Sequence, residues 1–162
     1  MNQAGNIYSF DTSSLIHAWR RAYPINNFPG FWDNLDDLIM DGRAFCAEEV
    51  LVELKKKDDD IYAWCKVRQK EFVIPFDDKQ QISIAGILGA HPRLVDTKKG
   101  RSECDPFVIA LAESNNPKLI VVTQEHYGSP QSPKIPDVCK SMGIRCINLI
   151  DFISEQNWKF GR

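Results

Sequence analysis

Residues 7–16 read Ile7-Tyr8-Ser9-Phe10-Asp11-Thr12-Ser13-Ser14-Leu15-Ile16, and they join a short run of strand-forming residues to a helix through one aspartate. We predict a strand over Ile7–Phe10 and a helix from about Ser13 to Arg20. Short apolar runs alternate with helical periodicity along the rest of the chain. Strands separated by helices imply a parallel sheet that is covered by helices on both faces.

Four later runs have the same strand-like character, and the clearest of them is Leu119–Val122. We therefore predict an α/β fold with three layers, α/β/α, around a central and mostly parallel sheet, in a single domain over residues 1–162. The other strands are predicted at Arg43–Cys46, Phe72–Ile74 and Arg145–Ile147, and the other helices from Phe31 to a stop at Gly42, over Glu48–Lys56, from Asp58 onward, from Asp77 through Leu88, from Pro106 onward, from Pro136 to about Gly143, and over Leu149–Trp158.

The composition is that of an ordinary globular protein, with 43% hydrophobic and 26% charged residues. No apolar run is long enough to span a bilayer, and residues 1–6 lack the basic and apolar regions of a secretory signal. We expect a cytoplasmic protein without membrane contact, whose five cysteines are reduced and mostly buried. The net charge of −2 does not indicate a nucleic-acid binder. A nuclease that holds cations through carboxylates is an exception, because the metal supplies positive charge.

Several charge runs have ordinary structural explanations. We place the acidic triplet, Asp58-Asp59-Asp60, at a helix N-terminus, where negative charge is favourable. Arg20-Arg21 and Lys55-Lys56-Lys57 are interpreted as solvated helix ends, where cations suit the helix dipole.

Two acids lie just past predicted strands. In an open parallel sheet, ligands bind in the crevice beyond the carboxyl ends of the strands. Asp11 directly follows its strand, and Glu125 follows Leu119–Val122 after Thr123 and Gln124. The position alone does not decide a role, because an Asp after a strand is also a common cap or turn residue.

Two further acids lie on predicted helices. Asp105 precedes a proline and is also explained as an N-cap, and topology alone does not place it at the same crevice. Glu53 has Glu49 one turn earlier, and such a like-charged pair is mildly destabilising. A cation would relieve this repulsion, as would Lys56 or Lys57. Spacing alone therefore leaves a shared metal site as one of several interpretations.

Four segments, in the same order along the chain, resemble the sequence elements of a PIN domain. The first has an Asp that is followed by Thr or Ser and an apolar helix, and the second has a helical Glu before Leu. The third has an Asp that opens a helix ending in Ala-x-Ala, and the fourth is usually strand-Thr-Asn-Asp. The matching segments here are Asp11–Ile16, Glu49–Leu54, Cys104–Ala112 and Val121–Glu125. The tail, Ile135–Cys139 with Gly143-Ile144, resembles a little-characterised bacterial branch of the same superfamily.

The resemblance, which extends to VapC-type toxin-like ribonucleases, implies a metal-dependent enzyme that hydrolyses the phosphodiester bonds of RNA. The implied cofactor is one or two Mg²⁺ or Mn²⁺ ions, since hard cations prefer oxygen ligands. Such an ion polarises the phosphate and activates a water for in-line attack. Thr12 and Thr123 are expected either to orient carboxylates or bound water or to serve as ordinary cap and strand-end residues. The catalytic and metal-binding residues implied are Asp11, Glu53, Asp105 and Glu125.

The resemblance also implies partners, namely RNA, an antitoxin protein that occludes the pocket, and a second copy of the chain in a homodimer. Lys98, Lys99 and Arg101 lie in the predicted loop before Asp105, and they are expected either to bind substrate phosphate or to be solvated loop residues. The fourth segment departs from the family, because it has Gln124-Glu125 where Asn-Asp is more usual.

Three other functions were weighed against the nuclease. A phosphatase of the haloacid-dehalogenase type needs a second Asp two residues after the first, where this chain has Ser13. A receiver-type phosphoacceptor module needs paired acids at the first strand and an Asp after the third, which are missing. A PIN-like scaffold that binds RNA or a protein without cleaving RNA agrees with the Gln124-Glu125 departure and with the acidic balance, so it stays open.

Overall fold

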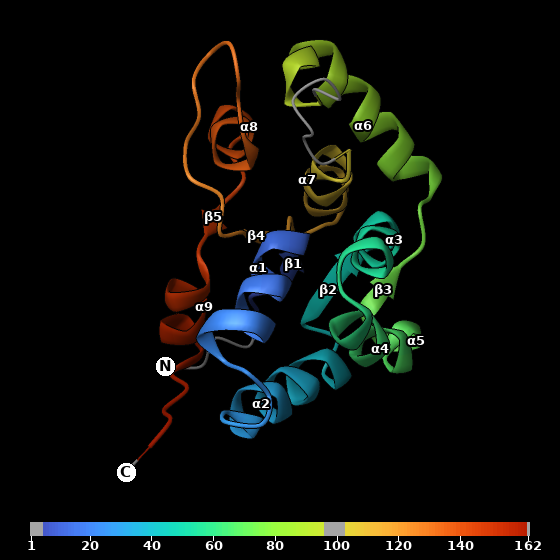
Figure 1. The fold of residues 1–162 in the computed structure, drawn as a ribbon. Coiled ribbons are helices and arrows are strands. Elements are labelled where there is room, and N and C mark those ends of the chain that lie inside the picture. The colour runs from blue at the N-terminus through green and yellow to red at the C-terminus, as the bar shows by residue number, and fades with distance from the viewer. Residues whose placement is uncertain (1–4, 96–102, 162) are drawn as a thin grey trace.

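The computed structural model describes residues 5–95 and 103–161 and has a five-stranded parallel sheet of order β3-β2-β1-β4-β5 (Figure 1). The order places β1 at the centre, and the chain switches direction across the sheet between β1 and β4, which is where open α/β sheets bind ligands. The predicted α/β fold with a parallel sheet is confirmed. The strands are β1 (Tyr8–Phe10), β2 (Ala44–Ala47), β3 (Val73–Ile74), β4 (Ile120–Val122) and β5 (Cys146–Ile147).

Helices connect the strands and cover the sheet (Figure 1). The first helix continues directly into a π-helical turn, η1, and η2 is a short 3-10 turn. The helical segments are α1 (Thr12–His17), η1 (Ala18–Ala22), α2 (Pro29–Met40), α3 (Glu48–Lys57), α4 (Asp59–Val67), α5 (Gln69–Phe72), α6 (Asp78–Ala90), η2 (Pro92–Leu94), α7 (Asp105–Ser114), α8 (Ile135–Met142) and α9 (Leu149–Gln156).

The central strand shows how the three layers form. Side chains alternate between the two faces of a strand, and Tyr8 and Phe10 both pack edge-on against Phe152 of α9, with ring centroids 4.9 and 5.0 Å apart. Ser9, between them, points to the other face, where its hydroxyl donates to the carbonyl of Val108 in α7 at 3.2 Å. All three β1 residues are buried, so the sheet is covered on both faces.

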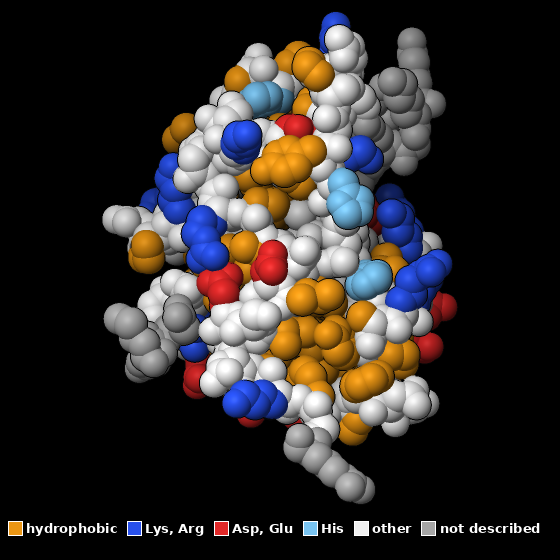
Figure 2. All heavy atoms as spheres, turned by 90° about the vertical axis from the view of Figure 1, so that its left-hand side faces the viewer, with side chains coloured by type: hydrophobic (Ala, Val, Ile, Leu, Met, Phe, Trp, Pro, Cys, Tyr) orange, Lys and Arg blue, Asp and Glu red, His pale blue; other side chains and the backbone are white. Residues whose placement is uncertain are grey.

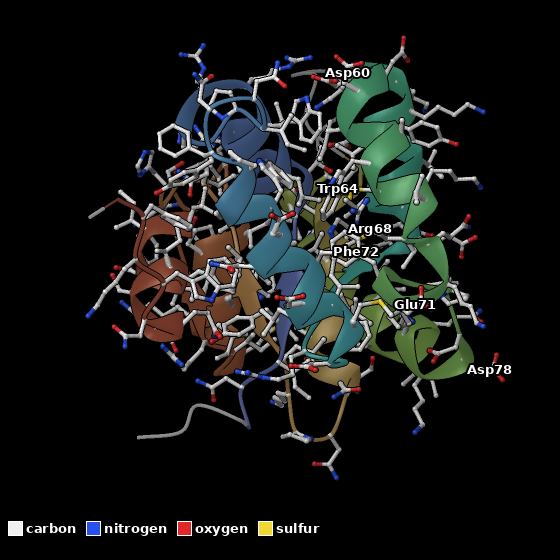
Figure 3. All side chains as sticks on the ribbon, turned by 90° about the horizontal axis from the view of Figure 1, so that it is seen from below. Asp60, Trp64, Arg68, Glu71, Phe72 and Asp78 are labelled. Atoms are coloured by element: carbon white, nitrogen blue, oxygen red, sulfur yellow. The ribbon has the colours of Figure 1, made fainter. Side chains whose placement is uncertain are left out.

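The corner formed by α2, α4 and α5 is held by one arginine. Arg68 lies over the Trp64 ring, 3.8 Å from its centroid, and its Nε donates to Asp36 of α2 at 2.7 Å. Figure 3 shows Trp64, Arg68 and Phe72 at this corner, whereas Asp60 and Asp78 lie at the outside of the molecule. The acidic triplet therefore begins α4 at the surface. Asp58 caps that helix, as predicted, by accepting from backbone N–H groups in its first turn.

Several element boundaries differ from the prediction by a few residues, and two of these differences concern the ends of helices. Phe72 ends α5 and is not part of a strand. The closing helix ends at Gln156 instead of Trp158, because Asn157 adopts a left-handed conformation with φ 56° that interrupts the helix.

The prediction that the cysteines are mostly buried is confirmed, since four of the five thiols are buried. Within residues 5–95 and 103–161, none of the helices has both the length and the apolar character needed to cross a membrane.

Candidate functional site

The four acids predicted from the sequence line one pocket of about 470 Å³. Asp11 follows β1 and Glu125 follows β4, so the pocket lies at the switch between these strands. Glu53 comes from α3 and Asp105 from the first turn of α7. We call these residues the pocket acids.

The direction of α7 explains why Asp105 reaches this edge of the sheet. The Leu119 N–H, just before β4, donates to the carbonyl of Ala112 near the end of α7 at 3.0 Å. The end of α7 therefore lies beside the start of β4, and the beginning of the helix lies toward the carboxyl ends of the strands. Sequence reasoning left this position open, because it depends on how the helix runs over the sheet.

Asp11 is buried and forms the floor of the pocket. One carboxylate oxygen, Oδ1, accepts from the Ser14 N–H at 2.7 Å and so caps α1. The other, Oδ2, accepts from the Ser13 hydroxyl at 2.7 Å and from the Thr123 hydroxyl. Burial raises the pKa of Asp11 to about 6, although hydrogen bonds from Thr123, Ser14 and Ser13 lower it. The orientation of this carboxylate is thus fixed by three donors.

Asp105 is only 9% exposed and is surrounded by like charges. Burial, followed by the negative charges of Glu125, Asp11 and Glu53, raises the pKa of Asp105 far above its ordinary value. A buried carboxylate in such a cluster is stable only with a bound proton or a nearby cation.

The two glutamates make contacts at the sides of the pocket. Glu53 Oε1 lies 3.4 Å from Lys57 Nζ, and the Glu53 side chain is 14% exposed. Glu125 Oε1 accepts from the Ile135 N–H, at the start of α8, at 3.4 Å. Both glutamates therefore reach the pocket on side chains that are also bound elsewhere.

The departure at Gln124-Glu125 has a structural consequence. The Gln124 amide oxygen accepts from the Leu149 N–H at the start of α9 at 2.8 Å, so this side chain ties the pocket wall to α9. Glu125 supplies the carboxylate at this corner, on a side chain one methylene longer than aspartate.

The donor set fits a hard divalent cation in its chemistry, since all four groups are carboxylates. In the described part of the chain, however, no group of three or more His, Cys, Asp or Glu side chains stands close enough together to hold a metal ion. Glu53 contacts Lys57, whereas Glu125 contacts the Ile135 N–H and also lies within hydrogen-bonding reach of Asp105.

The two predicted threonines have different surroundings. Thr123 donates to Asp11, and its oxygen accepts from the Glu125 N–H at 3.1 Å, so it links two of the pocket acids. Thr12 lines the pocket, but its hydroxyl lies 3.7 Å from the Cys104 thiol. The predicted phosphate-binding residues, Lys98, Lys99 and Arg101, lie outside the described residues.

Sequence reasoning missed Ser13. Its hydroxyl donates to Asp11 and accepts from the Gln124 N–H at 3.1 Å, so it connects the floor of the pocket to the segment after β4. The spacing of Ser13 two residues after Asp11 was the available indication, because hydroxyl side chains at helix starts often bond nearby backbone and side-chain groups.

Arg20 and Arg21 are exposed in the last turn of η1, in agreement with their interpretation as solvated helix ends, but they also have a place in the pocket. Both side chains line the acidic pocket, as do His17 and Lys57. The sequence placed these basic residues at helix termini correctly, but it did not show that the two termini converge on the same cavity.

Glu49 differs from Glu53 although it lies one turn earlier on α3. It does not line the pocket. Its Oε2 is buried and has no hydrogen-bond partner among the described residues, and burial raises the pKa of Glu49.

Comparison with known proteins gives a family and a fold. The sequence profile of the family described as Domain of unknown function (DUF4411) matches residues 8–160. No curated protein matches the chain in sequence.

Three solved structures share the fold. That of VapBC2 from Rickettsia felis bound to a DNA fragment from their promoter has a TM-score of 0.52 and 16% identity, covering 88% of this chain and 98% of that one. VapBC-1 from nontypeable Haemophilus influenzae has a TM-score of 0.55 and 13% identity, covering 86% and 96%. FitAcB from Neisseria gonorrhoeae has a TM-score of 0.50 and 16% identity, covering 88% and 97%.

Proposed function

This chain belongs to the DUF4411 family, and we propose that it is a metal-dependent ribonuclease that hydrolyses the phosphodiester bonds of RNA. The observation that carries the proposal is that four acids from separate parts of the chain line one pocket. A buried cluster of like charges is costly unless a proton or a cation compensates it. An all-carboxylate site suits Mg²⁺ or Mn²⁺.

The pocket acids have distinct parts in this proposal. When bound, Mg²⁺ or Mn²⁺ polarises a phosphate and lowers the pKa of an attacking water. Asp11 and Asp105 are the buried acids that would hold the cation, and Asp11 is already oriented by its three donors. Glu53 and Glu125 complete the set when their carboxylates turn from Lys57 and from the Ile135 amide. Thr123 holds the Asp11 carboxylate and the Glu125 backbone in fixed relative positions, because its hydroxyl hydrogen-bonds to both.

The proposal extends to partners. Solved structures of similar fold include those of VapBC2, VapBC-1 and FitAcB, and the sequence resembles VapC-type toxins. An antitoxin protein that covers the acidic pocket is therefore the proposed protein partner, and a homodimer is the proposed assembly. In this proposal the chain is the toxin of a toxin–antitoxin pair.

A scaffold that binds RNA or a protein without cleaving RNA is the second candidate. It is favoured by the Glu53 and Glu125 contacts, which hold the two carboxylates on other partners. The unusual Gln124-Glu125 pair agrees with it as well.

Cleavage of single-stranded RNA in Mn²⁺ by wild type and Glu53→Gln separates these candidates. The ribonuclease proposal expects the variant to lose most of its activity. It is expected to fold normally, because the Glu53–Lys57 pair has a half-exposed lysine and contributes no more than about 0.5 kcal/mol to stability. Glu71→Gln is the control, since Glu71 is on α5 and outside the pocket. Glu49→Gln is a second control that is expected to remain largely active, because Glu49 lies one turn earlier on α3 and outside the pocket.

Reactions with EDTA and a salt series accompany the assay, since contaminating ribonucleases often work without metal. Wild-type cleavage that survives EDTA, or that Glu53→Gln leaves unchanged, would defeat the enzyme proposal. Metal binding by all forms without any cleavage would favour the scaffold.

A further inference from the structure

One side of the acidic pocket is basic. His17, Arg20 and Arg21 from the α1–η1 helix and Lys57 from α3 line the same cavity as the pocket acids. Figure 2 shows histidine and Lys or Arg side chains next to one another along one edge of the face that it presents. A phosphodiester fits such a pocket, because its anionic oxygens need cationic partners on both sides.

Two of these basic residues are already used in the fold. Arg20 Nε donates to Asp58 Oδ2 at 2.6 Å, and Arg20 Nη2 donates to the Lys57 carbonyl at 2.8 Å. Lys57 Nζ lies 3.4 Å from Glu53 Oε1. These contacts anchor η1 to the junction between α3 and α4.

The other two basic residues are available to a ligand. Across residues 5–95 and 103–161, neither the His17 nor the Arg21 side chain makes a hydrogen bond, an ion pair or a ring contact. Arg21 is exposed, and His17 is half-buried. They are four residues apart on one continuous helix, so their side chains lie on the same side of it.

The backbone around Arg21 is held in place at both ends. Asp11 caps the start of the helix from the floor of the pocket, and η1 is a π-helical turn that the Tyr23 N–H closes on the Ala18 carbonyl at 2.8 Å. Such turns are frequent at functional sites. The neighbouring Arg20 clamp adds a third restraint. The guanidinium of Arg21 is therefore presented from a fixed backbone at the mouth of the pocket.

We propose that His17 and Arg21 form a phosphate-binding subsite for single-stranded RNA, which binds a phosphate next to the one positioned over the pocket acids. The inference rests on the proposed function for the identity of the strand. The planar guanidinium donates two parallel N–H bonds to phosphate oxygens, and the His17 imidazole adds an N–H donor beside it. The subsite fixes which phosphate of the strand lies over Asp11 and Asp105.

The test measures the affinity of the full chain for a fluorescently labelled single-stranded oligoribonucleotide. Binding is monitored by fluorescence anisotropy over a KCl series, with Ca²⁺ in place of Mn²⁺. Arg21→Gln is expected to bind about tenfold more weakly and to lower the slope of log affinity against log salt by about 0.7, the value for one phosphate contact on a single strand. His17→Gln is expected to weaken binding less. Arg21→Lys keeps the charge without the fork and is expected to fall between wild type and Arg21→Gln.

Lys70→Gln is the control, because it removes one positive charge from an exposed position outside the pocket. It is expected to change affinity by no more than about twofold. Thermal unfolding of each variant checks that folding is unchanged. Equal affinity and slope for wild type and Arg21→Gln, or no binding by wild type, would overturn the subsite. Weaker binding by Arg21→Gln together with no cleavage by wild type in Mn²⁺ would support the subsite and defeat the ribonuclease proposal.

Discussion

The acidic triplet and the pocket acids differ in how their charge is compensated. In the acidic triplet, the Asp58 carboxylate accepts from the N–H groups of Asp60 and Ile61 at 3.0 and 3.3 Å and pairs with Arg20 at 2.6 Å. The pocket acids come from four separate elements, and the negative charges around Asp105 raise its pKa. The charge of Asp58 is thus compensated within the fold, and we propose that a bound cation compensates the remaining charge of the pocket acids.

The largest expected effect concerns the metal. In calorimetric titration with Mn²⁺, Asp11→Asn and Asp105→Asn are each expected to weaken binding by about a hundredfold. Loss of a charged metal ligand is expected to lower the affinity more than loss of a residue that only hydrogen-bonds to a ligand. Asp60→Asn, in the triplet, is the matched control and is expected to bind as wild type does. Equal affinity in wild type and in both pocket variants would remove the distinction between the clusters.

The next effect is on stability in the absence of metal. The pKa of Asp11 is about 6 in the folded state against an ordinary value of 3.8, so the folded state holds this proton more tightly. The free energy of unfolding therefore falls as the pH rises from about 4 to about 6. The pKa of Asp105 is raised in the same direction, so the free energy of unfolding continues to fall at higher pH.

Asp105→Asn mimics the protonated acid, and we expect it to raise the free energy of unfolding at pH 8 in EDTA by about 2 kcal/mol and to flatten the pH dependence. Urea titrations at pH 5 and pH 8 measure both quantities. An Asp105→Asn protein that loses stability as steeply as wild type over this range would show that the charge of Asp105 is already compensated.

The triplet is expected to respond with the opposite sign. Asp58→Ala removes the cap of α4, and we expect a loss of about 1 kcal/mol in the free energy of unfolding. Thermal unfolding at neutral pH, measured in low and in high salt, tests this prediction. High salt screens the ion pair of Asp58 with Arg20, whereas the hydrogen bonds by which Asp58 caps the helix persist, so the loss of stability should remain in high salt. A stabilised Asp58→Ala protein would mean that the triplet too is an uncompensated cluster.

The smallest expected effect is that of Glu49→Gln. The buried Oε2 of Glu49 has no partner among the described residues, so removal of the charge is expected to change the free energy of unfolding by about 0.5 kcal/mol or less, toward higher stability. A loss of more than about 1 kcal/mol in urea titration would instead reveal a stabilising role for the carboxylate.

The sheet and most of the helices were predictable, because apolar periodicity records which side of each element is buried. The end of α5 at Phe72 was not, because a short apolar run fits a strand and a helical turn equally well. The stop of α9 at Asn157 depends on one left-handed residue, and Asn adopts that conformation only in some contexts.

The candidate site was predictable in its acids but not in its surroundings. Asp11 and Glu125 follow strands, and the family resemblance indicated Glu53 and Asp105. The hydrogen bonds of Ser13 and the convergence of Arg21 on the same cavity depend on how distant segments pack. No local pattern carries that information, although the sequence correctly placed Arg20, Arg21 and Lys57 at exposed helix ends.

The contact between Glu125 and the Ile135 amide links the state of the pocket to the first turn of α8. A cation or a strand that draws the Glu125 carboxylate inward breaks this hydrogen bond and leaves the amide open to water. Hydrogen–deuterium exchange at Ile135 would then quicken while the Ser14 amide, bound to Asp11 at the floor, stays slow. Occupancy of the pocket would thus be recorded as a difference in exchange rate between two backbone positions, without any need to observe the ligand itself.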